Sequence, residues 1–73
     1  MIEVNRIRFK AKLVASEDIS FDYDETNHKI TIIGTELAVL RICYAFREEQ
    51  IYYGKTNDGK FYFELELTWT LQT

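Results

Sequence analysis

Basic residues recur at every second position near the start of the chain, at Arg6, Arg8, Lys10 and Lys12. Residues two apart share one face of an extended strand, so a strand here would present a basic row able to follow a phosphate backbone. Acidic residues expected on neighbouring strands would neutralise this row, namely Asp22, Asp24, Glu64 and Glu66. We therefore interpret the row first as a solvated face with cross-strand ion pairs, and second as an anion-binding site.

The other residue types that carry chemistry are too few for a catalytic or metal site. His28 is the only histidine and falls in a predicted turn, whereas zinc normally needs four ligands. Cys43, the only cysteine, lies in the middle of a predicted helix, where no base or helix N-terminus would activate its thiol. Carboxylates beside arginines and lysines would stay ionised. The sequence thus predicts neither an enzyme nor a cofactor or metal site.

Length and composition predict a single domain over residues 1–73. A chain of 73 residues has room for one small core, and 15% aromatic residues supply much of its burial. A lone cysteine and the lack of a signal-like stretch predict a cytoplasmic protein. No apolar run approaches the roughly 18 residues of a membrane span, so no membrane partner is expected. The net charge of −3 disfavours a nucleic-acid-coating role.

Alternating polar and apolar residues predict strands in the first half of the chain. The pattern runs over residues 6–13, 19–24 and 29–33, with turns between, and is typical of a three-stranded meander. In the register that buries the apolar residues, Lys10 faces Asp22 and Arg8 faces Asp24 on the solvent side.

A last hairpin follows from the end of the sequence. Residues 51–53 form a short predicted strand, and from Phe61 to Leu71 every second residue is large and apolar. Asn57-Asp58-Gly59 between them suits a turn that ends in a left-handed glycine.

A helix is predicted between these two strand groups, over Glu36–Glu49. Gly34 interrupts the preceding strand, Thr35 can cap the helix, and Glu36 suits the first helical turn. The segment is rich in leucine, alanine, arginine and glutamate, which favour helices.

The element order is therefore β-β-β-α-β-β, an α+β fold. The arrangement we expect is a five-stranded antiparallel sheet of order 3-2-1-5-4, with the helix packed across one face. The chain is similar to the OB-fold, a small barrel, in the order of these elements alone, so an OB-like barrel is the alternative.

The predicted helix carries two apolar stripes, although a helix that covers one sheet needs only one. The second stripe consists of Leu37, Leu40 and Tyr44 and is flanked by Arg41 and Arg47. Tyrosines on the outer face of the last hairpin, Tyr52 and Tyr62, add residue types that are enriched in protein interfaces. These seven residues are the predicted partner-binding site.

The leading functional hypothesis is a small non-enzymatic protein-interaction module that self-associates into a homo-oligomer. One biological use would be a phage-type inhibitor of a host or defence protein. A second hypothesis is an oligomer that sequesters an anionic small molecule, such as a nucleotide, between Arg41, Arg47 and Tyr44. A third is an OB-like binder of single-stranded nucleic acid through residues 6–13.

Overall fold

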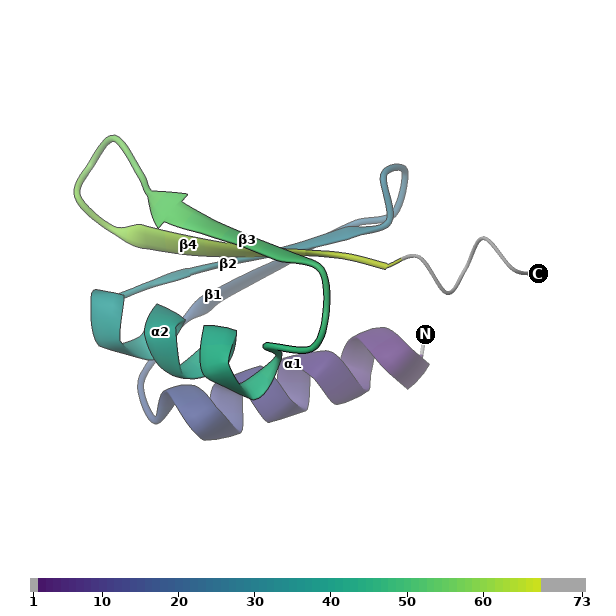
Figure 1. Ribbon diagram of the computed structural model, residues 1–73. Helices are drawn as coiled ribbons and strands as arrows, with labels where there is room; N and C mark the ends of the chain where they lie inside the picture. The colour runs from purple at the N-terminus through teal and green to yellow at the C-terminus, as the bar shows by residue number, and fades with distance from the viewer. Residues whose placement is uncertain (1, 68–73) are drawn as a thin grey trace.

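Two helices and four strands make up the computed structural model, which describes residues 2–67. In chain order they are α1 (Ile2–Ala15), β1 (Ser20–Asp24), β2 (Lys29–Gly34), α2 (Glu36–Ala45), β3 (Ile51–Lys55) and β4 (Phe61–Glu66). The strands form one antiparallel sheet, and both helices lie on the same face of it (Figure 1). The predicted α+β class is confirmed.

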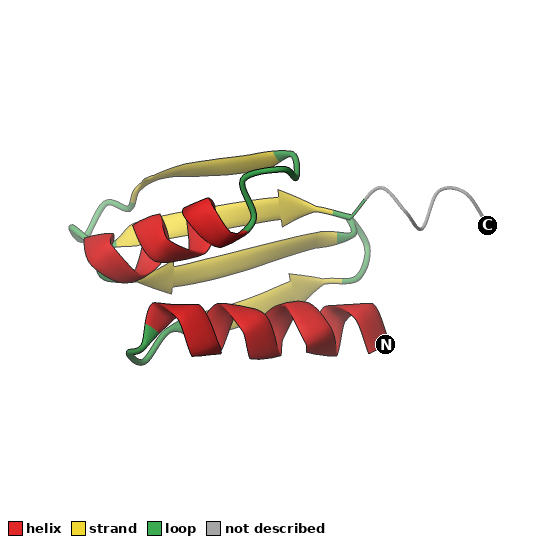
Figure 2. Cartoon of the chain, turned by 60° about the horizontal axis from the view of Figure 1, so that its bottom comes forward, coloured by secondary structure: helices red, strands yellow, loops and turns green. Residues whose placement is uncertain are grey.

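The strand order across the sheet is β1-β2-β4-β3, with antiparallel neighbours throughout. Two of the predicted hairpins are present, β1 with β2 and β3 with β4, whereas the predicted hairpin between residues 6–13 and 19–24 is absent. The hairpins are joined by their second strands, which pair from Lys29↔Glu66 to Gly34↔Phe61. Helix α2 carries the chain from β2 to the far edge of the sheet, where β3 begins (Figure 2).

The two central strands, β2 and β4, supply the sheet side of the hydrophobic core. Ile30 lies opposite Leu65 and Ile32 lies opposite Phe63, and all four side chains are buried. Since alternate residues of a strand point to opposite faces, these four mark the face that the helices cover. Val39 and Ile42 of α2 pack against these residues and complete the core on the helix side.

Residues 2–15 form a helix, so the strand predicted over residues 6–13 is wrong. Val4, Ile7, Ala11 and Ala15 are all buried, at the three- and four-residue spacing of a helical stripe. The apolar residues of this segment fit both the period of two of a strand and the period of 3.6 of a helix. The small apolar residues Ala11 and Ala15 can belong to the buried side in both cases. Close packing of α1 beside α2 decides between them, and residues 2–15 contribute no strand.

The sheet is consequently open and four-stranded. Neither the five-stranded order 3-2-1-5-4 nor the OB-like alternative is confirmed, and the prediction of a single helix is wrong. The part of the predicted last strand beyond residue 67 lies outside the described residues. None of the helices found within residues 2–67 has the length and apolarity needed to cross a membrane.

Local signals around α2 and the last hairpin are confirmed. The Thr35 hydroxyl accepts a hydrogen bond from the Ala38 amide at 3.2 Å, as an N-cap does. The helix ends at Ala45 and continues as turns, four residues before the predicted end at Glu49. Gly59 has a φ of +88°, the left-handed conformation that its turn was expected to need.

Candidate functional site

Large apolar side chains are exposed on both helices, on the side away from the sheet. They are Phe9 (70% exposed) and Leu13 (66%) on α1, and Leu37 (53%), Leu40 (44%) and Tyr44 (69%) on α2. We call these five residues the outer helix face. Helices α1 and α2 lie side by side in one layer (Figures 1 and 2), so both stripes belong to the same side of the molecule.

The α2 part of this face was predicted, and the structure leaves it uncovered by the described chain. Val39 and Ile42 face the sheet, and the stripe of Leu37, Leu40 and Tyr44 lies on the opposite side of the helix. The sheet therefore uses only one of the two apolar stripes.

The α1 part was missed, because Phe9 and Leu13 were assigned to the buried side of a strand. A signal was nevertheless present. Their spacing of four residues places them on one helical face, opposite the stripe that contains Ile7 and Ala11.

Both predicted arginines of α2 border the outer helix face. The Arg41 guanidinium donates a hydrogen bond to the Ala15 carbonyl at 3.2 Å, which ties α2 to the last residue of α1. The Arg47 guanidinium lies 4.3 Å from the centre of the Tyr44 ring and donates to the Tyr44 carbonyl at 2.9 Å. Both guanidinium groups thus already have partners within the chain.

The four N-terminal bases do not form a single row. On a helix each residue is rotated by about 100° from the last, so the row splits into two pairs on either side of the Phe9–Leu13 stripe. Arg8 lies 5.9 Å from the Phe21 ring of β1, on one side, whereas Lys10 lies 4.7 Å from the Phe46 ring, on the other. Lys12 follows Arg8 by four residues, and Arg6 precedes Lys10 by four. The predicted anion-binding row is therefore not assembled.

The four acids that were expected to neutralise the basic row lie on the open face of the sheet, which faces away from the helices. Strand register places on this face Asp22, Asp24, Glu64 and Glu66, together with Lys29. Lys29 and Glu64 approach to 3.9 Å across β2 and β4. The predicted pairs Lys10–Asp22 and Arg8–Asp24 are wrong, because α1 lies over the other face. The four N-terminal bases and these four acids thus lie on opposite sides of the sheet.

Tyr52 and Tyr62 also lie on the open face, remote from the outer helix face with which they were grouped. Tyr52 is 48% exposed, and Tyr62 is partly covered. The Tyr62 ring lies over Gly54, where an added Cβ would be 2.8 Å from the Tyr62 hydroxyl oxygen. Tyr53, which was not predicted, is exposed on the helix side of β3. The predicted partner-binding residues therefore belong to two faces.

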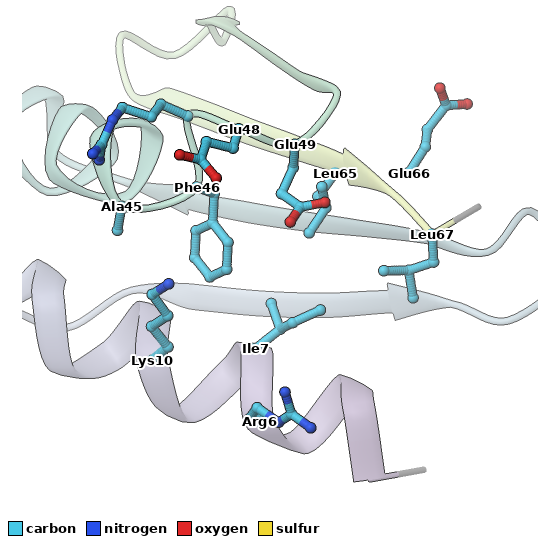
Figure 3. A pocket seen from close by; sticks show the side chains of 11 residues that line it. Arg6, Ile7, Lys10, Ala45, Phe46, Glu48, Glu49, Leu65, Glu66 and Leu67 are labelled. Carbon is cyan, nitrogen blue, oxygen red and sulfur yellow. The ribbon is translucent and has the colours of Figure 1, made fainter. Parts of the chain in front are cut away.

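A groove of about 390 Å³ lies where α1, the end of α2 and the end of β4 meet (Figure 3). Its apolar lining includes Ile7 and Phe46, and the Lys10 side chain extends toward Phe46. Both signs of charge line its rim, with Arg6, Lys10 and Arg47 against Glu48, Glu49 and Glu66. Three carboxylates among three cations do not favour an anionic ligand here.

Cys43 and His28 have the environments that the sequence predicts. Cys43 is half-buried on α2 against the core, and burial raises the pKa of its thiol, so the reactive thiolate is disfavoured. His28 lies in the β1–β2 turn. Within residues 2–67 no group of three or more histidine, cysteine, aspartate or glutamate residues is placed to hold a metal ion.

Comparisons with protein-family models, with curated proteins and with solved structures found no match to this chain.

Proposed function

We propose that this protein is a non-enzymatic interaction module that binds a protein surface through its outer helix face. The observation that carries the proposal is the exposure of five large apolar side chains, between 44% and 70%, on one side of the helix layer. Single exposed apolar residues are ordinary, but a group of them on one face is typical of interaction sites.

The composition of the face supports protein binding. Aromatic residues and arginine are enriched in protein interfaces, and this face carries Phe9 and Tyr44 with Arg41 and Arg47 beside them. The stacked Arg47–Tyr44 pair is held in one geometry by the chain itself, which lowers the entropy lost on binding.

The same geometry gives less support to a sequestered anion. That function would require Arg41 and Arg47 to bind a phosphate in a two-pronged manner. Arg41 is engaged by the Ala15 carbonyl and Arg47 by Tyr44, on opposite sides of the α2 stripe. The narrower hypothesis of a phage-type inhibitor rests on size and missing chemistry and stays a prediction, as does the cytoplasmic location.

Replacement of Leu40 by aspartate tests the proposal. Leu40 lies within the α2 stripe and is half exposed, so Leu40→Asp should keep the native circular dichroism spectrum and lower the affinity for a protein partner, its own copy included, by at least about tenfold. Sedimentation velocity of the pure protein and quantitative mass spectrometry of proteins retained from native-host extract provide the two measurements.

Lys60→Gln is the matched control, because it changes the charge by the same amount at an exposed position in the β3–β4 loop. This variant should behave as the wild type in both measurements. The proposal would be refuted if the wild-type protein stays monomeric and retains from the extract the same proteins as Leu40→Asp.

A further inference from the structure

The two faces of the molecule are complementary to each other. We infer that the protein that docks on the outer helix face is a second copy of this chain, which presents the open face of its sheet. This inference rests on the proposed function and adds the identity of the partner and the surface that the partner uses.

The helix layer is a basic and apolar surface. Besides its five exposed apolar residues, it carries the bases Arg6, Arg8, Lys10, Lys12 and Arg41, and just beyond the end of α2 Arg47 is followed by Glu48 and Glu49. Among the helix side chains that the structure describes, Glu36 is the only acid. A partner surface with the opposite charge would gain most from docking here.

The open face of the sheet is such a surface. Its acids are Asp22, Asp24, Glu64 and Glu66, with Lys29 as the one base that the strands place there. Between and beside these acids lie Thr31, Ile33, Tyr62 and Tyr52, which offer apolar area to the leucines and aromatics of the helix face. Neither helix covers this face (Figure 1).

Charge then selects the geometry of association. Two copies joined helix face to helix face would place bases against bases, and two joined sheet face to sheet face would place acids against acids. Contact between the helix face of one copy and the sheet face of the next brings opposite charges together. Such a contact is head-to-tail, so each added copy leaves one face of either kind free for another.

The available area is sufficient for a specific contact. The chain has an accessible surface of 5167 Å². A standard interface takes about 800 Å² from each partner, which is less than a sixth of this surface.

A mixing experiment with two variants tests this geometry. Leu40→Asp disables the helix face and keeps the sheet face, whereas the double variant Asp22→Lys with Glu66→Lys disables the sheet face and keeps the helix face. Asp22 and Glu66 are exposed at positions that face away from the core, so we expect native circular dichroism spectra.

Sedimentation velocity at low salt should show the wild type as a series of species that lengthens with concentration. Raising the sodium chloride concentration to about 0.5 M should lower the affinity of this association by at least about tenfold, because salt screens charges across an interface. Each variant alone should be monomeric. Their equimolar mixture should form dimers and nothing larger, since one intact helix face then meets one intact sheet face.

Two outcomes would overturn the inference. If the double variant still dimerises by itself, the contact is symmetric and uses the helix face twice. If the wild type stays monomeric at high micromolar concentration, the partner is not a second copy. In the second case, Leu40-dependent binding of a different protein would leave the proposed function standing, and its absence would remove both.

Discussion

Asp24 shows how a single carboxylate can serve the fold. Its side chain accepts hydrogen bonds from the Thr26 amide at 3.0 Å, the Asn27 amide at 3.2 Å and the Asn27 side-chain amide at 2.7 Å. These bonds, that of the Asn27 side chain first, lower the pKa of Asp24 below its ordinary value of 3.8. The residue therefore closes the β1–β2 turn, and it does not pair with Arg8 as the sequence predicted.

The lowered pKa gives a testable dependence of stability on pH. A carboxyl whose pKa is lower in the folded state stabilises that state above pH 3.8, and the stabilisation is lost as the pH falls through the lowered pKa. Asp24→Asn should thus be less stable at neutral pH and should show a shallower loss of unfolding free energy on acidification. Urea unfolding from pH 6 down to about pH 2 measures both quantities.

Asn27→Ala is the companion variant, because it removes the main donor and keeps the carboxyl group. Its acid slope should also be shallower than that of the wild type. A slope unchanged in Asp24→Asn would show that the turn does not depend on the ionised carboxylate.

At the scale of elements, α1 is the segment whose sequence supports two structures. As a strand, residues 6–13 would bury Phe9 with Ile7 and Ala11. As a helix, they bury Ile7 and Ala11 but leave Phe9 exposed. Phe9, like Leu13, is therefore a residue whose burial differs between the two structures.

A pair of lysine substitutions tests the helix directly. Phe9→Lys should change the free energy of unfolding of the monomer by no more than about 0.5 kcal/mol, as exposed surface positions usually do. Ala11→Lys should cost at least about 2 kcal/mol, because it forces a charged side chain into the fully buried contact of α1 with the core. Urea unfolding monitored by far-ultraviolet circular dichroism gives both values. Comparable large losses for the two variants would instead indicate a strand that buries Phe9.

At the scale of the whole molecule, one aromatic residue joins the sheet to the helix layer. Phe63 is fully buried on the central strand β4, opposite Ile32, and its ring centre lies 5.8 Å from that of Phe46, the residue that follows α2. The total stability of the chain should be about 4–11 kcal/mol, from the usual range per residue.

Phe63→Ala should therefore remove a large part of the stability. Replacement of a buried phenylalanine by alanine costs about 3–5 kcal/mol, so the melting temperature measured by circular dichroism should fall by at least about 12 °C. The control is Tyr53→Ala, which replaces an exposed aromatic residue of β3 that pairs with Phe63 of β4, and it should cost no more than about 1 kcal/mol. Equal losses of stability in the two variants would show that Phe63 is not a core residue.

The sequence alone was sufficient for features that depend on neighbours along the chain. The Thr35 cap, the left-handed Gly59, the β1–β2 and β3–β4 hairpins and the unused stripe of α2 were predicted correctly, because each follows from the conformation or periodicity of a few consecutive residues. The tertiary structure decided the rest. Residues 2–15 could bury a stripe as strand or as helix, and only packing against α2 selects the helix. Because residues 2–15 are a helix, the four N-terminal bases lie in the helix layer and the acids of the strands lie on the open face of the sheet. Phe9 and Leu13 are exposed for the same reason and belong to the candidate binding surface.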